Sequence, residues 1–196
     1  MTVYAQEAVS EVIRQTGDFY EADILDELRE MYPVQRTIVD VGANIGNHAA
    51  YWSAFVPHTA MHCFEPVPDN YELLLLNAPG AVCHPAALSD VQGRVKMAAD
   101  WQNMGRSHIA RRGDFRVTTR TLDTFHLDDV SLLKIDVEGY EGKVLMGARR
   151  TVMRSHPAIV VEDEHDAFGD HLMWAGISGY RKTREWSGAN DLWEWS

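Results

Sequence analysis

The feature that most constrains the fold is a strand–loop–helix segment, IVDVGANIGNHA, at residues 38–49. It begins in a β-branched run, Thr37–Val41, and continues into a helical pattern. Gly42 and Gly46 permit a tight turn and let a ligand approach the backbone closely. Asn44 stands between them, and asparagine tolerates the left-handed conformation better than other bulky residues. Such a loop at a strand end is typical of a ligand-binding α/β sheet.

The rest of the chain continues this alternation of short apolar strands and amphipathic helices, which predicts a mostly parallel sheet covered on both faces. Its 196 residues suit one domain, so we assign residues 1–196 to a single unit. Residues 1–33 form two N-terminal helices, which Gly17 and Pro33 end. We expect helices over 5–15, 21–31, 47–55, 69–77 and 140–149, and strands over 37–41, 60–64, 81–84, 130–137 and 158–161, with two more strands within 179–196.

Residues 91–120 interrupt the alternation. Short β-like runs at 94–98 and 115–119 predict an inserted hairpin or lid, and we expect residues 98–113 to cover the acceptor site. This stretch carries Trp101, Asn103, Arg106 and His108. Its basic residues either hold an anionic substrate group or offset carboxylates on a solvated face; they are Arg106, Arg111, Arg112, Arg116 and Arg120.

Charge and composition exclude several classes of protein. The net charge of −11 argues against a nucleic-acid partner, because an acidic chain repels phosphate. No apolar run approaches the ~20 residues that span a bilayer, and no basic segment precedes an apolar one at the start. We therefore expect no membrane partner and a cytoplasmic location. Cys63 and Cys83 lie in strand-like runs, so we expect buried free thiols, and no zinc-site spacing occurs.

An acid follows the second predicted strand. Glu65 lies twenty-five residues after Asp40, where its two oxygens can accept both hydroxyls of a ribose. Alone, a glutamate before Pro66 would suit a surface turn, but the glycine loop at this distance favours the ribose role. Ser89, in the PAALSD turn at 85–90, could meet an adenine edge, although such a turn is also ordinary.

Three more acids follow later strands. Asp136 ends the predicted fourth strand in LLKIDVEGYE, at the carboxyl edge where open α/β sheets bind ligands. Glu138 alternates with it, so we expect the two side chains to point to opposite sides. We interpret Glu141 as a helix first-turn acid. Glu162 occupies the corresponding end of the next strand.

Together these blocks resemble the FkbM-type methyltransferases, a family of class I enzymes that use S-adenosylmethionine. TLD followed closely by KIDVEG is the most family-specific part, and the resemblance weakens after residue 165. The matching blocks are GDFYEADIL (17–25), IVDVGANIGNHA (38–49), CFEPVPDN (63–70), AALSD (86–90), NMG (103–105), TRTLDTF (119–125) and LLKIDVEGYEGKVLMGA (132–148).

The resemblance implies a Rossmann-like three-layer sandwich around a seven-stranded mixed sheet whose last strands are antiparallel. It implies methyl transfer, usually to an oxygen of a small molecule or sugar. For the methionine portion of the cofactor it implies Asp40, Gly42, Asn44 and Gly46, with Glu21 at the amino-acid end. It implies Glu65 for the ribose and Leu88 and Ser89 for the adenine. We count their neighbours Ala43, Asn47 and Pro66 among the cofactor contacts, together with Asp136.

A hydroxyl acceptor is a poor nucleophile at neutral pH, so a base or a metal must activate it. Our first candidate for the base is Asp136, followed by Glu138, Glu162 and His48. His48 either touches the cofactor or substrate or is a helix residue without a role. Asp136 and Glu162 could also hold Mg²⁺, although no metal site is signalled. Two alternatives remain open: an inactive cofactor-binding module of this fold, and an NAD-dependent oxidoreductase, against which the absence of G-x-G-x-x-G counts.

Overall fold

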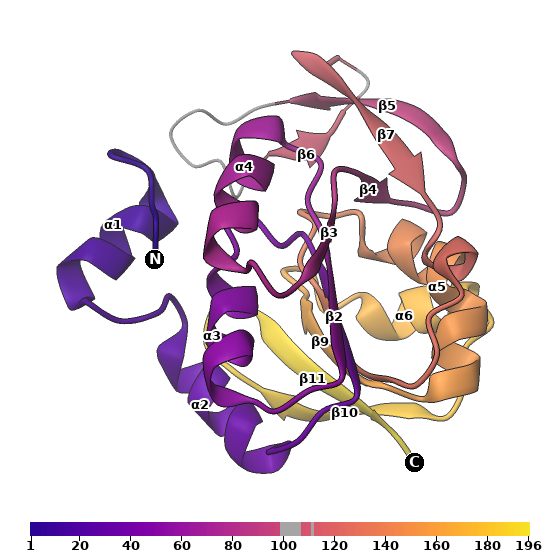
Figure 1. Ribbon diagram of the computed structural model, residues 1–196. Helices are drawn as coiled ribbons and strands as arrows, with labels where there is room; N and C mark the ends of the chain where they lie inside the picture. Colours follow the sequence, from indigo (N-terminus) through magenta and orange to yellow (C-terminus); the bar gives the residue numbers. More distant parts are fainter. Residues whose placement is uncertain (99–106, 111) are drawn as a thin grey trace.

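The computed structural model describes residues 1–98, 107–110 and 112–196. Its main feature is a sheet with the strand order β10-β11-β9-β8-β1-β2-β3 (Figure 1). The strands are β1 (Thr37–Val41), β2 (Ala60–Phe64), β3 (Val82–His84), β8 (Val130–Ile135), β9 (Ala158–Glu162), β10 (Tyr180–Glu185) and β11 (Asn190–Trp195). The central pairs are parallel, whereas β11 pairs antiparallel with both β9 and β10. The expected seven-stranded mixed sheet is confirmed.

Helices cover both faces of this sheet (Figure 1). On one face lie α2 (Ala22–Met31), α3 (Asn47–Phe55) and α4 (Pro68–Asn77), and on the other lie α5 (Glu141–Ser155) and α6 (Phe168–Trp174). The first helix, α1 (Ala8–Thr16), lies beside them and ends at Gly17, whose φ is 71°. The predicted stop before Pro33 is also found, because α2 ends at Met31.

The alternation of side chains along the strands divides the interior into two apolar clusters. Val39, Leu133 and Ile159 belong to the cluster under α5 and α6. Ile38 and Leu132 belong to the cluster under α2 and α3. This alternation matters for the site, because side chains two residues apart on a strand share a face.

The predicted insert forms a second sheet with the order β4-β7-β5-β6. Its strands are β4 (Ala87–Leu88), β5 (Gly93–Ala98), β6 (His108–Ile109) and β7 (Phe115–Arg120). The expected hairpin is the antiparallel pair β5 and β7. Trp101, Asn103, Arg106 and Arg111 lie outside the described residues.

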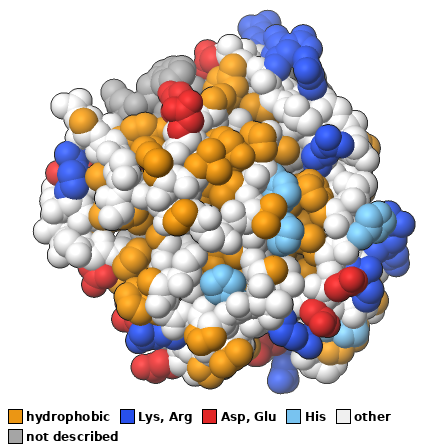
Figure 2. Space-filling model, in the orientation of Figure 1, with side chains coloured by type: hydrophobic (Ala, Val, Ile, Leu, Met, Phe, Trp, Pro, Cys, Tyr) orange, Lys and Arg blue, Asp and Glu red, His pale blue; other side chains and the backbone are white. Residues whose placement is uncertain are grey.

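The other three arginines of the basic stretch, Arg112, Arg116 and Arg120, are exposed. Figure 2 shows Lys and Arg side chains gathered where the second sheet reaches the surface. Arg120 donates a hydrogen bond to Gln92.

Two boundaries differ from the sequence-based expectations. The fourth strand of the main sheet, β8, ends at Ile135 rather than at residue 137. The helix after it, α5, runs six residues beyond Arg149 to Ser155, and it buries Thr151 and Val152. A short 3-10 helix, η2 (Leu122–Phe125), packs against α5. Asp123 in η2 accepts hydrogen bonds from the backbone N–H groups of Arg150 and Thr151, which anchors this added part of α5.

Two smaller expectations are resolved by the structure. Both cysteines are free thiols as expected, but only Cys63 is buried, whereas Cys83, its neighbour across β2 and β3, is half-buried. Within the described ranges, no helix is long and apolar enough to cross a membrane.

Candidate active site

A pocket holding about 620 Å³ of unfilled space opens at the carboxyl ends of β1, β2 and β8. The second sheet forms one wall, through Met97 of β5 and His108 and Ile109 of β6. The two ends of the pocket differ in chemistry. Leu88, Met97 and Ile109 make one end apolar, whereas Asp136 and Glu138 make the other acidic.

Glu65 lies at the floor of the pocket and is only 4 % exposed. Its Oε1 accepts a hydrogen bond from the Val67 N–H at 2.8 Å, and its Oε2 accepts one from the Asn44 N–H at 2.9 Å. Burial raises the pKa of Glu65 to about 7, although these two N–H donors oppose the rise. Each oxygen keeps a lone pair for a further donor, such as a hydroxyl of a ribose.

The glycine loop follows β1 and has the backbone that its sequence requires. Gly42 and Gly46 have φ values of 80° and 85°, and Asn44 adopts the left-handed conformation with φ 50°. A Cβ atom on Gly42 would lie 1.8 Å from the carbonyl oxygen of Asp136. Gly42 is therefore required because the backbone after β8 passes directly over it. Gly46 similarly faces α4, where an added Cβ atom would lie 3.0 Å from the side chain of Leu74.

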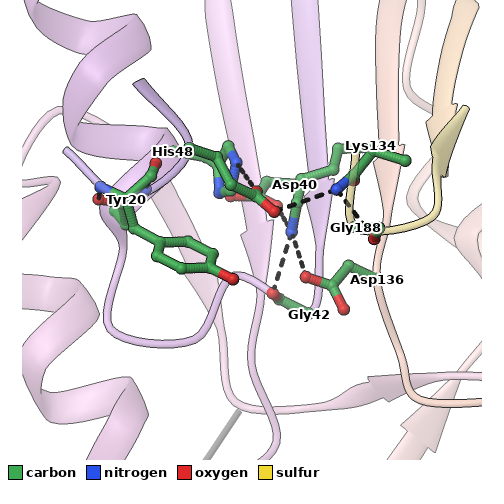
Figure 3. Close-up of polar contacts among 10 residues, drawn as sticks. Tyr20, Asp40, Gly42, His48, Lys134, Asp136 and Gly188 are labelled. Carbon is green, nitrogen blue, oxygen red and sulfur yellow. Dashed lines mark hydrogen bonds and ion pairs between the residues drawn. The ribbon is translucent and has the colours of Figure 1, made fainter. Parts of the chain in front are cut away.

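A buried lysine that is not among the sequence-based candidates connects the loop to two acids. Lys134 of β8 is 4 % exposed, and its Nζ lies 3.4 Å from Asp40 Oδ1 and 3.2 Å from Asp136 Oδ2. The same Nζ donates to the carbonyl oxygen of Gly42 at 3.4 Å (Figure 3). Burial acts to lower the pKa of Lys134, but the charges of Asp136, Asp40 and Glu21 raise it above its ordinary value. Lys134 is therefore a fixed cation at the base of the site.

Asp40 is fully buried and does not line the pocket. At the end of β1, Asp40 could orient the loop or accept a hydrogen bond from a ligand amine, and its contact with Lys134 supports the first role. Lys134 is the only charged residue of the run VSLLKI, which marks it as unusual, but the run does not indicate that Asp40 is its partner, because that depends on the register of β8 and β1.

Asp136, Glu138 and Glu162 come together, each offering an oxygen within 4.8 Å of the others. The expectation that Asp136 and Glu138 point to opposite sides is wrong. β8 has already ended at Ile135, and Glu138 adopts a left-handed turn with φ 55°, so the alternation of a strand no longer applies.

The pKa values of two of these acids move in opposite directions. Burial acts to raise the pKa of Asp136, but the charge of Lys134 and a hydrogen bond with Glu162 lower it. Burial raises the pKa of Glu162, and the negative charge of Asp136 raises it further. Asp136 is therefore the more acidic member of the pair, and Glu162 binds a proton more strongly.

The segment before α2 closes the acidic end. Asn47, the first residue of α3, accepts from the Tyr20 N–H at 3.0 Å and donates to the Tyr20 carbonyl oxygen at 2.9 Å. This reciprocal pair fixes Glu21, whose Oε2 lies 3.2 Å from Nε2 of His48 and whose Oε1 accepts from Asn190 at 3.0 Å. The ring of Tyr20 points toward Gly42 and Asp136 (Figure 3). Tyr20 was not among the sequence-based candidates.

The remaining candidates divide into two groups. Pro66 and Leu88 line the pocket, as does Asn44. Ala43, Gly46, Asn47 and Ser89 do not line it; the Ser89 hydroxyl instead donates to Asp90 at 3.0 Å and lies 3.3 Å from the Tyr140 hydroxyl.

The pocket fits the cofactor that the sequence resemblance implies. Its apolar end suits an adenine, Glu65 suits a ribose diol, and the acidic end suits a sulfonium. Asn44 supplies an independent observation: its Oδ1 is buried and has no hydrogen-bond partner among the described residues, so it is available to a donor on a ligand. Unpartnered buried acceptors of this kind are costly unless a ligand or water satisfies them.

Comparisons with known proteins agree with this geometry. The model of the methyltransferase FkbM domain family matches residues 40–182. The chain is 29 % identical over 173 residues to the hexuronic acid methyltransferase AglP of Haloferax volcanii, covering 80 % of this chain and 68 % of that protein. It is 26 % identical over 145 residues to the 2-O-methyltransferase NoeI of Sinorhizobium fredii, covering 60 % of this chain and 59 % of that protein.

Solved structures show the same fold. The FkbM methyltransferase of Methylobacillus flagellatus matches with a TM-score of 0.61 at 20 % identity, covering 82 % of this chain and 44 % of that chain. A TehB-like methyltransferase of Corynebacterium glutamicum matches with a TM-score of 0.55 at 15 % identity, covering 95 % and 94 %. This chain thus spans less than two thirds of some of its relatives.

The family model covers more than two thirds of the residues, including the glycine loop, Glu65 and the three clustered acids. It favours a methyltransferase over the NAD-dependent alternative. The chain therefore belongs to the FkbM family of S-adenosylmethionine-dependent methyltransferases.

Proposed function

We propose that this protein transfers a methyl group from S-adenosylmethionine to a hydroxyl oxygen of a sugar or other small-molecule acceptor. The observation that carries the proposal is the chemistry of the pocket, whose lining combines Glu65 and an apolar wall with Asp136 and Glu138, and Glu162 lies beside these two acids. The two curated relatives, named for a hexuronic acid and for a 2-O position, support a sugar hydroxyl as the acceptor.

The cofactor, when bound, supplies a methyl group on a positively charged sulfur, and the sulfur leaves as a neutral thioether. The acceptor oxygen forms the new bond to carbon and loses its proton, so the protein must hold the acceptor in line and take that proton. Tyr20 and the acids at the strand ends surround the space where this acceptor would lie.

Glu162 suits the role of base better than Asp136, our first candidate from sequence. Asp136 is paired with Lys134, and its lowered pKa makes it a weak proton acceptor. Burial and the charge of Asp136 raise the pKa of Glu162, so its ionised form, which the positive charge of the bound cofactor would favour, accepts a proton more readily than Asp136 does. In this arrangement Asp136 keeps its charge and orients Glu162. Residues 98–113 stay our candidate for a lid over the acceptor, and most of them lie outside the described residues.

The experiment is a transfer assay with cofactor labelled on the methyl group and a panel of hexoses, hexuronic acids and oligosaccharides. We expect a labelled methyl ether, identified by mass spectrometry and NMR. Label on nitrogen or carbon would contradict O-methylation. Binding of the cofactor without methyl transfer to any acceptor tested would favour an inactive module.

Variants then assign the base. Glu162→Gln should lower kcat by ~10²-fold or more with an unchanged Kd for the cofactor, which is the usual scale for a general base. Glu185→Gln, which removes an exposed acid at the end of β10, is the matched control and should retain full turnover. If Glu162→Gln turns over normally, Glu162 is not the base.

A further inference from the structure

We propose that Lys134 is a positioning residue for the methyl-transfer site: its ammonium group ties the carbonyl of Gly42 to the carboxylates of Asp40 and Asp136, and so holds the loop that receives the methionine end of the cofactor. The proposal rests on the function proposed above. The sequence motif of the glycine loop does not itself indicate a lysine in this role.

The geometry places one cation among three acceptors from three segments. Asp40 comes from the end of β1, Gly42 from the loop, and Asp136 from the first residue after β8. Lys134 and Asp40 are neighbours in the register of β8 and β1, so their side chains leave the sheet on the same face. Figure 3 shows the ammonium group between these acceptors.

Packing alone does not account for a lysine here. Apart from Asp40, its neighbours on this face include the apolar side chains of Leu132 on the same strand and of Val160, which is paired with Lys134 on β9. A methionine or leucine would fill such a position without the cost of removing a charge from water. A buried lysine is tolerated because Asp40 and Asp136 surround it. The lysine and its two aspartates must therefore be explained together.

The loop is then held at two points. The Asn44 N–H is fixed by Glu65, and the Gly42 carbonyl is fixed by Lys134. These two anchors act on different parts of the cofactor pocket. Glu65 lies toward the apolar end, whereas Lys134 supports the end that Asp136 lines. Loss of Lys134 should therefore weaken recognition of the amino-acid portion and leave the nucleoside portion bound.

The test compares two ligands that differ in that portion. S-adenosylhomocysteine has both portions, and methylthioadenosine lacks the amino-acid group. Calorimetry on Lys134→Met should show an increase of about tenfold or more in the Kd for S-adenosylhomocysteine, and less than about twofold for methylthioadenosine. Hydrogen exchange should become faster at the amides of residues 42–46.

The matched control is Lys182→Met. Lys182 is another lysine held by two carboxylates, with its Nζ 2.7 Å from Asp166 and 2.6 Å from Asp191, but it lies on β10 and does not line the cofactor pocket. This variant should change neither Kd nor the exchange of the loop. An equal loss of both ligands in Lys134→Met would indicate a general structural role and overturn the proposal, as would unchanged binding of both.

Lys134→Met leaves Asp40 buried with an uncompensated charge, which can prevent folding. If it does, the double variant Lys134→Met/Asp40→Asn removes both charges at nearly constant volume, and Asp40→Asn alone is its reference. We expect the double variant to fold. Compared with Asp40→Asn, it should bind S-adenosylhomocysteine more weakly and methylthioadenosine equally well. Failure of the double variant to fold would show that Lys134 serves the fold itself and would overturn the proposal. If the unaltered protein binds neither ligand, the proposed function fails as well, whereas normal binding by all variants rejects the role of Lys134 alone.

Discussion

Glu65 shows how burial gives a single carboxyl group a pH-dependent role. Its pKa is raised to about 7 because it is buried, which is close to physiological pH. Ribose hydroxyls donate to the ionised form, so binding favours the deprotonated state. Cofactor affinity should therefore be full above pH 8 and decrease by up to about tenfold per pH unit below 7.

The measurement is the Kd for S-adenosylhomocysteine between pH 5.5 and 8.5. This range is chosen because a carboxyl group titrates mostly within about one pH unit on each side of its pKa. Glu65→Gln should bind S-adenosylhomocysteine more weakly, with a loss of roughly 2–4 kcal/mol in binding free energy. The affinity of this variant should depend little on pH in the same range. Asp69→Asn, at an exposed acid of α4, should keep the pH dependence of the unaltered protein. A flat profile in the unaltered protein would contradict the ribose role.

The cluster of Asp136, Glu138 and Glu162 raises the question of a metal ion. Lys134 already provides a positive partner for Asp136, with its Nζ 3.2 Å from Oδ2. We therefore expect turnover to be unchanged after treatment with EDTA and after addition of Mg²⁺. Loss of turnover in EDTA that Mg²⁺ restores would show that the cluster binds a metal.

The sequence identified the candidate residues of the site better than their contacts. Glu65 and Asn44 occupy the places expected from their motifs. The charge network around Lys134 could not be predicted, because it depends on the register between β1 and β8, which no local pattern specifies. The proximity of Glu138 to Asp136 likewise depends on a left-handed turn, and glutamate rarely adopts that conformation.

Among the elements, the junction of β1 with the glycine loop is held by close backbone contact. Gly42 and Gly139 both have left-handed φ values, but an added Cβ meets the Asp136 carbonyl at Gly42 and open space at Gly139. Gly139→Ala should lower the free energy of unfolding by about 1–2 kcal/mol through backbone strain alone. Gly42→Ala should cost roughly 1–3 kcal/mol more, because the β8 backbone must move.

Urea unfolding of both variants measures this difference. Equal losses of stability would mean that the ends of β1 and β8 move apart at little cost in free energy. That result would contradict the close packing of the loop. The contact at Gly42 adds a second reason for this glycine, which also lines the pocket, as its interpretation from sequence expects. No local pattern indicates that a neighbouring strand end occupies that space.

The elements themselves were largely predictable, because hydrophobic periodicity and stop signals act locally. All seven strands of the main sheet were expected. Errors arose where tertiary contacts decide a boundary. β8 ends early because Asp136 turns into the site, and α5 continues because Asp123 caps its backbone from a different segment.

For the whole molecule, the proposed cofactor should act as a stabiliser. A ligand that binds only the folded state at about 100 times its Kd adds roughly 2.7 kcal/mol of stability. For a chain of this size, S-adenosylhomocysteine should therefore raise Tm by about 5–10 °C. Differential scanning fluorimetry measures this shift, and NAD at the same concentration should produce none. Stabilisation by NAD alone would reject the proposed cofactor.

The placement of β11 also affects how the protein is made. β11 lies between β9 and β10 although it follows both in the chain. During synthesis, β9 and β10 therefore leave the ribosome before the strand that must separate them. This side of the sheet reaches its final order only after residues 190–195 emerge, whereas β1, β2 and β3 can already pair on the nascent chain.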